Sequence, residues 1–384
     1  MPSPTIFLVA GEPSGDALGA ALIRSLRAQR DDLVICGVGG PEMEAEGLES
    51  LFPMSDLAVM GLVEVLPRAR AILRRLRETA EAVARVDPAV VVTIDTQGFS
   101  WRLAKRLQPS PRPLVYYVAP TVWAWKPRRA HKVSRLIDRV LLLFPFEKPY
   151  WDAVDQDAVF VGHPVADAPV ERERARELHT VLRGGRDGPL LALLPGSRTG
   201  EIRRHLGLFG EVAERIAKER PGLSLVIPTV ANVADLVRAE TASWTVPLRV
   251  MEVEAAERRS AMAACDAALA VSGTVALDLA AAGTPHVIAY RANPITFQIV
   301  RRMVSIAQIS LVNLIAGRPV TPELIQHQCT PEALFGALDP LIDDGEPARA
   351  QREAMSAVIS ALRPQGETSS TTAARAILEM ITTR

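Results

Sequence analysis

Short apolar runs that alternate with helical patterns constrain this fold more than any other feature of the sequence. They are rich in Val, Ile and Leu, and they hardly alternate between polar and apolar residues. Strands of this kind are buried on both faces, as in parallel sheets covered by helices. There are too many of these runs for one ordinary doubly wound sheet. They occupy residues 6–10, 33–38, 90–94, 114–118, 140–144, 158–161, 190–194, 223–227, 248–251, 267–271 and 286–290.

A polar stretch rich in Arg and Gly, at residues 171–189, separates these runs into two groups. We therefore predict an α/β fold with two Rossmann-like domains and a ligand cleft between them, at the carboxyl ends of the strands. The first domain is expected at residues 1–170 and the second at residues 187–346. Residues 347–384 are expected to form helices around a PQGETSS break, and these helices are candidates to complete the first domain.

The charge and cysteine content exclude several classes of protein. Lys plus Arg and Asp plus Glu both number 44, so no net charge draws the chain toward nucleic acid. Three distant cysteines favour a reducing cytosol over a disulfide framework. The spacing of Cys and His does not indicate a metal site. No apolar run approaches 18 residues and no signal-peptide pattern precedes the first run, so a cytosolic protein is expected.

Two turns in the second half of the chain are candidate phosphate sites. Ser272, Gly273 and Thr274 separate an apolar run from a helix of small residues, and such a turn presents free backbone N–H groups to an anion. Asp278, about one helical turn further on, is placed to accept hydrogen bonds from sugar hydroxyls. The second turn follows residues 190–194 and contains Gly196, Ser197 and Arg198. The guanidinium of Arg198 adds a fixed positive fork for a diphosphate.

The first half carries a different set of polar residues after its strands. The sequence AGEPSGDALGA follows the first run: Gly11 and Gly15 permit a tight turn, Ser14 or Asp16 is suited to cap the next helix, and Glu12 is a candidate cleft carboxylate. We expect these five residues to line the acceptor side of the cleft. An ordinary strand-to-helix turn explains the glycines equally well.

Asp95 ends a central strand, where a general base would be needed, although a carboxylate that caps loop amides is the alternative. In the second half, Asn313 lies within the apolar run SLVNLIAG and needs hydrogen-bond partners.

Two further segments are candidates for substrate or membrane contact. Trp123, Trp125 and Lys126 combine aromatic faces with a cation, which suits sugar rings and phosphates, but a packed loop explains them as well. Residues 60–78 form an apolar stripe with a basic flank, the composition of an interfacial helix. An ordinary surface helix is the alternative. The residues expected at the membrane are Met60, Leu62, Val63, Leu66 and Arg68.

The motifs occur together in an order that resembles the lipid-A-disaccharide synthase family, bacterial inverting glycosyltransferases of the GT-B fold. The resemblance covers essentially the whole chain, and the combination of GEPSGD, VWAWK and LVNLIAG is its most specific part. The residues that match the family's essential positions are Asp95, Arg198 and Asn313, so the resemblance implies that these three are catalytic. Two positions depart from the usual pattern: Gly98, where many members have Asp, and Asp278, where many have Glu.

The resemblance implies a donor, UDP-2,3-diacylglucosamine, and an acceptor, 2,3-diacylglucosamine 1-phosphate (lipid X). The products are then a β-1,6-linked disaccharide 1-phosphate and UDP. No metal or other cofactor is expected. The protein is expected in the cytoplasm, peripheral on the cytoplasmic face of the inner membrane, with a homodimer as a possible assembly.

Two alternatives remain at this stage. Another GT-B enzyme, such as a nucleotide-sugar epimerase, would need the phosphate turns but no lipid surface. A non-enzymatic nucleotide-sugar-binding protein would explain the turns and leave Asp95 without a role.

Overall fold

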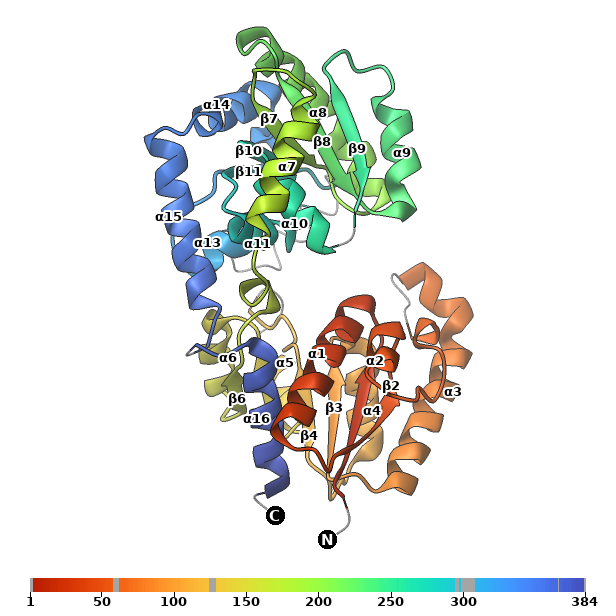
Figure 1. Cartoon of the computed structure of the whole chain (residues 1–384). Helices are drawn as coiled ribbons and strands as arrows, with labels where there is room; N and C mark the ends of the chain where they lie inside the picture. Colours follow the sequence, from red (N-terminus) through yellow and green to blue (C-terminus); the bar gives the residue numbers. More distant parts are fainter. Residues whose placement is uncertain are drawn as a thin grey trace. The chain divides into compact units, whose positions relative to one another are not determined.

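The chain folds into two compact units. The computed structural model describes residues 3–57, 62–123, 129–253, 255–293, 297, 308–364 and 366–382. Unit 1 comprises Met1–Asp167 and Leu362–Arg384, and unit 2 comprises Ala168–Ala361 (Figure 1).

Unit 1 is a parallel sheet with helices on both faces. Its strands are β1 (Thr5–Ala10), β2 (Val34–Val38), β3 (Val90–Ile94), β4 (Leu114–Tyr117), β5 (Arg139–Leu142) and β6 (Asp157–Phe160). Its helices are α1 (Pro13–Gln29), α2 (Pro41–Ala45), α3 (Leu62–Val86), α4 (Gln97–Leu107), α5 (Arg129–Ser134), α6 (Lys148–Asp152) and α16 (Ser369–Thr382). Short 3-10 turns lie at Met54–Asp56, Pro145–Glu147 and Pro164–Ala166.

Unit 2 repeats this architecture. Its strands are β7 (Leu190–Leu194), β8 (Ser224–Thr229), β9 (Leu248–Glu252), β10 (Ala267–Val271), β11 (His286–Tyr290) and β12 (Glu323–Ile325). Its helices are α7 (Arg172–Arg183), α8 (Thr199–Glu219), α9 (Ala231–Thr241), α10 (Ala255–Ala263), α11 (Val275–Ala282), α13 (Leu311–Ala316), α14 (Pro331–Ile342) and α15 (Glu346–Ala361). A 3-10 turn at Gln326–Gln328 follows β12.

Both sheets are six-stranded and parallel, which confirms the predicted class of two Rossmann-like α/β domains. The strand order is β2-β1-β3-β4-β5-β6 in unit 1 and β12-β11-β10-β7-β8-β9 in unit 2. Each predicted apolar run overlaps an observed strand. The sequence prediction missed β12, which is only three residues long, half-buried and at the edge of its sheet.

Two apolar layers enclose the sheet of unit 1. Residues of β1 alternate between them, since Leu8 belongs to one layer and Phe7 to the other. The layer that contains Leu8 also includes Leu22 of α1 and Ile377 of α16, so the end of the chain is part of the core of unit 1. The opposite layer includes Leu103 of α4.

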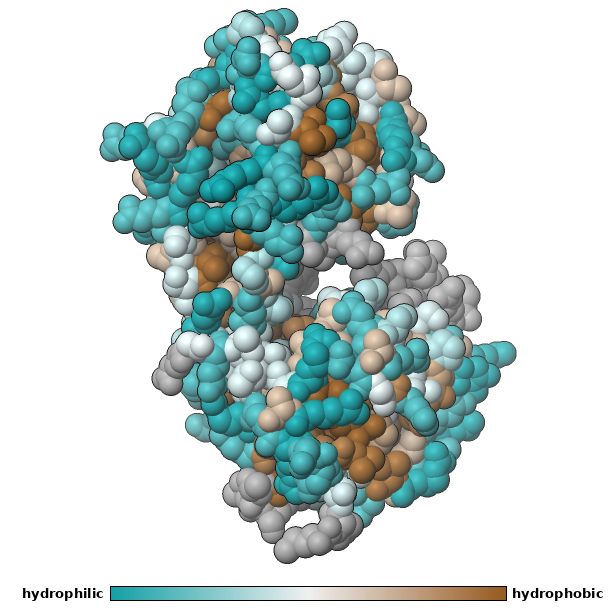
Figure 2. Space-filling model, viewed as in Figure 1, coloured by the Kyte–Doolittle hydropathy of each residue, from teal (hydrophilic) through white to brown (hydrophobic). Residues whose placement is uncertain are grey.

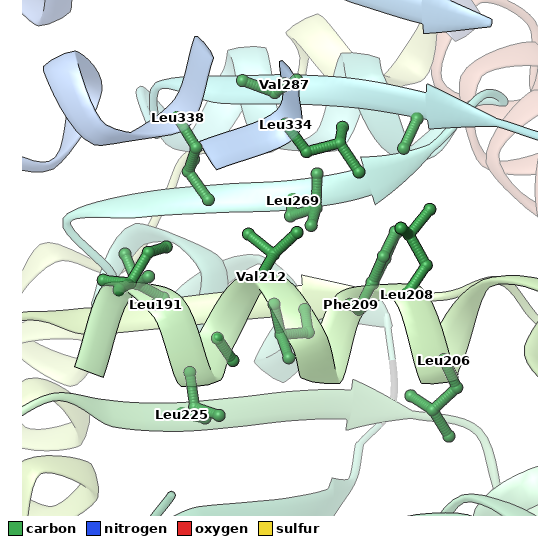
Figure 3. Packing of buried hydrophobic residues seen from close by; sticks show 14 of the residues in the cluster. Leu191, Leu206, Leu208, Phe209, Val212, Leu225, Leu269, Val287, Leu334 and Leu338 are labelled. Carbon is green, nitrogen blue, oxygen red and sulfur yellow. The ribbon is translucent and has the colours of Figure 1, made fainter. Parts of the chain in front are cut away.

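An apolar core of unit 2 lies between its sheet and helices α8 and α14. Phe209 and Val212 of α8 and Leu334 of α14 point at the sheet, where they meet Leu269 of β10 and Val287 of β11 (Figure 3). All of these side chains are buried. This packing fixes the central strands whose ends carry the candidate phosphate turns.

The boundaries between the units differ from the predicted ones. The chain passes from unit 1 to unit 2 after Asp167, ahead of the polar stretch, and α7 within that stretch belongs to unit 2. The apolar face of α7 explains this placement, because Ala175, Leu178 and Leu182 are buried. Helix α15 also belongs to unit 2, so only residues from Leu362 onward return to unit 1.

We expect Ile377→Ala to destabilise unit 1 by about 2–5 kcal/mol, because it removes a fully buried side chain from the layer between α16 and the sheet. Urea unfolding monitored by tryptophan fluorescence measures this change in the free energy of unfolding, since unit 1 contains Trp101, Trp123, Trp125 and Trp151. The exposed Arg375→Ala is the control and should change stability by less than about 0.5 kcal/mol. An Ile377→Ala transition at the wild-type urea concentration would contradict the role assigned to α16.

Candidate active site

Asp95, the candidate base of unit 1, lies at the point in the sheet where neighbouring strands connect onward in opposite directions. From the adjacent strands β1 and β3, the chain continues to β2 on one side and to β4, β5 and β6 on the other. Ligands of open α/β sheets bind at such a point, beyond the carboxyl ends of the strands. Because Ala10 pairs with Ile94, the loops that begin at Gly11 and Asp95 leave the sheet side by side.

Asp95 is held by contacts from helix α1 and from strand β4. Its carboxylate oxygen Oδ2 accepts a hydrogen bond of 2.7 Å from the Ser14 hydroxyl in the first turn of α1. Its backbone N–H donates to the Tyr117 carbonyl at 3.1 Å. A Cβ added to Gly15 would lie 3.0 Å from the Ile94 carbonyl oxygen and 3.6 Å from the Asp95 Cβ, so a larger residue would push α1 slightly away from β3.

The environment of Asp95 favours its protonated form. Burial raises the pKa of the Asp95 carboxyl above its ordinary value, and the Ser14 hydrogen bond opposes this shift. The backbone of Asp95 has a φ of +47°, a left-handed conformation that Asp adopts more readily than most residues. A carboxylate that is partly desolvated, hydrogen-bonded on one oxygen and placed at a strand end is suited to accept a proton from a substrate.

The other predicted residues of this loop have different roles. Glu12 is the half-buried N-cap residue of α1, and its carbonyl accepts the first helical hydrogen bond, from the Asp16 N–H at 2.9 Å. Gly11 packs directly against Thr96, in the loop that follows Asp95. The predicted caps of α1 are wrong, because neither Ser14 nor Asp16 makes a side-chain capping bond to that helix.

Asp16 is a structural residue. Its buried carboxylate accepts hydrogen bonds from the backbone N–H groups of Gly40 at 2.8 Å, Glu42 at 2.9 Å and Met43 at 3.1 Å. It therefore holds the start of α2, where helical N–H groups otherwise lack acceptors. The prediction that Asp16 faces a substrate is corrected accordingly.

Trp123 does not display its ring for a sugar. It is 9% exposed, its Nε1 donates to Glu147 Oε1 at 3.2 Å, and its ring meets Phe146 edge to face. Burial raises the pKa of Glu147 to about 7. Trp123 thus belongs to the core of unit 1, which corrects its assignment as a sugar contact. Trp125 and Lys126 lie outside the described residues.

At Gly98, where many members of the family have Asp, a side chain would lie next to the guanidinium of Arg102. Gly98 is exposed in the first turn of α4, and a Cβ there would lie 3.3 Å from Nη1 of Arg102. That guanidinium donates to the Gly98 carbonyl at 2.8 Å.

In unit 2 the structure brings all the predicted donor residues to one cavity. It has a volume of about 330 Å³ and lies at the carboxyl ends of the adjacent strands β7 and β10, where the connections of this sheet diverge. The predicted residues in its wall are Gly196, Ser197, Arg198, Ser272, Gly273, Thr274 and Asp278. Both turns precede helices, α8 and α11, whose first N–H groups lack helical acceptors.

The turn after β7 requires a glycine and displays an arginine. Gly196 has a φ of +111°, and a Cβ there would overlap the side chain of Glu201. Arg198 is the N-cap residue of α8, and its side chain is 67% exposed. Its guanidinium lies 3.0 Å from Glu201, a weak exposed pair that leaves the guanidinium available to an anion.

Sequence reasoning missed a second cation in this cavity, Arg258 of α10. Its guanidinium lies 3.4 Å from the Asp278 carboxylate, and its buried Nε has no hydrogen-bond partner among the described residues. Burial raises the pKa of Asp278, whereas Arg258 and Arg259 lower it. In the sequence, Arg258 resembles any solvated arginine of a surface helix, so no local signal marks it.

Asn313 does not contact this cavity. It is 1% exposed, and both its amide protons and its oxygen are bonded to protein groups, including the Thr321 carbonyl at 2.8 Å and the Val320 N–H at 2.7 Å. It is not among the residues lining the donor cavity. The prediction that Asn313 acts directly on substrate is therefore corrected to a role in holding the surrounding chain.

The candidate membrane segment is described only in part. Met60 and the side chains of Leu62, Val63, Leu66 and Arg68 lie outside the described residues. The described part of α3 is hydrophilic on the face seen in Figure 2, and its Arg75 is bonded to Asp56 and Glu78. Among the helices that the structure describes, none is both long and apolar enough to cross a membrane.

The pKa shift of Asp95 predicts a pH-dependent gain in stability for Asp95→Asn. A raised pKa in the folded state means that ionisation destabilises the fold, so the stability that this group contributes is lost as pH rises through its folded pKa. The variant should therefore have a higher thermal midpoint than wild type at pH 7, and the difference should disappear at about pH 3.

Asp87→Asn is a control for which the expected change in thermal midpoint at pH 7 has the opposite sign. Asp87 also has a left-handed backbone, with a φ of +50°, but its pairing with Arg112 lowers its pKa. Its contribution to stability is present at neutral pH and is lost as pH falls, so Asp87→Asn should lower the midpoint at pH 7. Equal shifts for the two variants would contradict the environment described for Asp95.

The chain matches known proteins over nearly its whole length. Residues 6–378 match the family model described as lipid-A-disaccharide synthetase. The lipid-A-disaccharide synthase of Rhodospirillum centenum is 44% identical over 385 residues, covering 99% of this chain and 95% of that protein.

Similar solved structures have the same fold. The calicheamicin glycosyltransferase CalG4 has a TM-score of 0.60 at 16% identity and covers 100% of this chain and 99% of that one. The UDP-N-acetylglucosamine 2-epimerase described from Listeria monocytogenes has a TM-score of 0.66 at 15% identity and covers 99% of this chain and 96% of that one. At such identities the likeness shows the GT-B fold alone, whereas the family match favours a synthase over an epimerase or a binding protein. The chain belongs to the lipid-A-disaccharide synthase family, and it is a glycosyltransferase that forms the lipid A disaccharide.

Proposed function

We propose that the donor is UDP-2,3-diacylglucosamine, bound through its diphosphate in the unit 2 cavity. The observation that carries this proposal is the meeting of two helix-initiating turns and two arginines at one cavity. Free N–H groups at helix starts bind phosphate oxygens, and Arg198 and Arg258 supply positive charge for a diphosphate. Asp278 is then placed to accept hydrogen bonds from the ribose hydroxyls, in exchange for its weak pairing with Arg258.

Asp95 acts as the general base in this proposal. The acceptor is lipid X, and its 6-hydroxyl attacks the anomeric carbon of the donor while Asp95 takes the hydroxyl proton. The bond between the anomeric carbon and the diphosphate oxygen breaks, so that UDP leaves with that electron pair. The product is a β-1,6-linked disaccharide 1-phosphate. Ser14 occupies Oδ2 of Asp95, which leaves Oδ1 for the proton.

The leaving group is stabilised by groups that are already in place. Negative charge accumulates on the diphosphate as UDP departs. The residues of both turns, Arg198 among them, line the cavity, so their amides and the guanidinium are available to that charge. Such preorganised donors favour the transition state because little reorganisation is needed when the bond breaks.

We further propose that the enzyme works at the cytoplasmic face of the inner membrane. Both substrates carry acyl chains, and the start of α3 combines apolar residues with arginine, a composition typical of interfacial segments. Leu62, Val63 and Leu66 would contact acyl chains, and Arg68 would face lipid phosphates.

The direct test is incubation of the enzyme with UDP-2,3-diacylglucosamine and lipid X, followed by mass detection of the disaccharide. Asp95→Asn should lower kcat by at least about 10²-fold, the usual contribution of a positioned base, and leave UDP affinity unchanged. Asp87→Asn should retain wild-type turnover. Near-full turnover by a folded Asp95→Asn enzyme would contradict the assignment of the base, and UDP release without disaccharide would indicate another acceptor.

The membrane proposal is tested by replacing Leu62, Val63 and Leu66 together with Ser. Binding to anionic phospholipid vesicles, measured by sedimentation, should fall several-fold, because the apolar contribution to interfacial binding is removed. Val181→Ser, which alters an exposed apolar residue of α7 in unit 2, should bind vesicles as wild type does. Equal vesicle binding by all three proteins would refute the proposed contact.

A further inference from the structure

A carboxylate on the edge strand β12 organises the chain beside the donor turn. Glu323 accepts three hydrogen bonds: from the Ile309 N–H at 2.9 Å, from the Ser310 N–H at 3.0 Å and from the Asn313 side-chain amide at 2.7 Å. Bonds to an ionised acceptor are about twice as strong as neutral ones. Glu323 therefore fixes residues 309–310, which lead into α13, against the edge of the sheet.

Asn313 joins the Glu323 carboxylate to the loop that precedes β12. Its second amide proton is donated to the Thr321 carbonyl at 2.8 Å. Its oxygen accepts from the N–H groups of Val320 at 2.7 Å and Thr321 at 2.9 Å. Because the carboxamide is buried and fully bonded, it holds the loop that leads into β12 against α13 and orients Glu323.

One further hydrogen bond connects this assembly to the proposed diphosphate site. The Ser272 hydroxyl, in the turn after β10, donates to the Ile309 carbonyl at 3.1 Å. Ile309 is thus held at its N–H by Glu323 and at its carbonyl by Ser272. Ser272 lines the donor cavity, whereas Glu323 and Ile309 do not.

We propose that Glu323 is a positioning residue for the donor diphosphate, acting through Ile309 and Ser272. The carboxylate holds Ile309 where its carbonyl can receive the Ser272 proton, and that bond keeps the 272–274 turn open toward the cavity. The inference rests on the proposed donor site, and it gives Asn313 a physical role at a distance from the substrate. Glu323→Gln breaks the arrangement with little change in size, since an amide nitrogen would face a backbone N–H.

The test is a double-mutant cycle of Glu323→Gln and Ser272→Ala, read as UDP affinity by calorimetry. Glu332→Gln is the control, because that exposed glutamate lies on α14, away from this network. We expect Glu323→Gln to weaken UDP binding and to raise the donor KM about 10-fold, with the acceptor KM within about 2-fold of wild type. In the Ser272→Ala background the same substitution should cost much less, since the connection is already cut.

Amide hydrogen exchange gives a second measurement that does not depend on ligand. Exchange at residues 272–276 should be faster in Glu323→Gln and unchanged in Glu332→Gln. If Glu323→Gln does not fold, Glu323→Asp, which leaves the carboxylate one methylene short, enters the same cycle with the same expected direction.

The outcomes separate this inference from the proposed function. Unchanged UDP affinity in a folded Glu323 variant, or penalties that simply add in the double mutant, would overturn the positioning role. Failure of the wild-type enzyme to bind UDP would instead overturn the proposed donor site, and hydrogen exchange would still decide whether Glu323 orders the turn.

Discussion

Both candidate sites depend on the pairing of two parallel strands whose onward connections diverge. Ala10 pairs with Ile94 in unit 1, and Ala270 pairs with Leu194 in unit 2. Parallel pairing brings the carboxyl ends of neighbouring strands to the same edge, so segments some 80 residues apart leave the sheet side by side. The two apolar layers of unit 1, and the core between the unit 2 sheet and helices α8 and α14, stabilise this pairing. The pairing in turn places the polar residues at the edge.

The same edge carries two different kinds of chemistry in the two units. In unit 1 a carboxylate is partly removed from water, which raises its affinity for a proton and lowers the stability of the fold at neutral pH. In unit 2 two helix-initiating turns and two arginines line a cavity at this edge, where we propose that a diphosphate binds. A base and an anion site are the two requirements for transferring a sugar from a nucleotide diphosphate to a hydroxyl.

Patterns local in sequence predicted the strands and the two turns that begin α8 and α11, because buried parallel strands and helix-initiating turns have local signatures. Asp16, Trp123 and Asn313 were predicted to face substrate, but their side chains contact protein groups instead. Their partners are the start of α2, Glu147, and the loop before β12, which only the tertiary structure identifies. Strand β12 was missed because three residues are too few for a periodic pattern, and Arg258 because its burial depends on packing around α10.

A crystal structure of the enzyme with UDP tests the central claim most directly. We predict that the diphosphate oxygens lie within hydrogen-bond distance of the backbone amides of both turns, at 196–199 and 272–275, with the Arg198 guanidinium on the same oxygens. A UDP diphosphate bound elsewhere, for example at the strand ends of unit 1 beside Asp95, would contradict the division of the two chemical tasks between the two sheets.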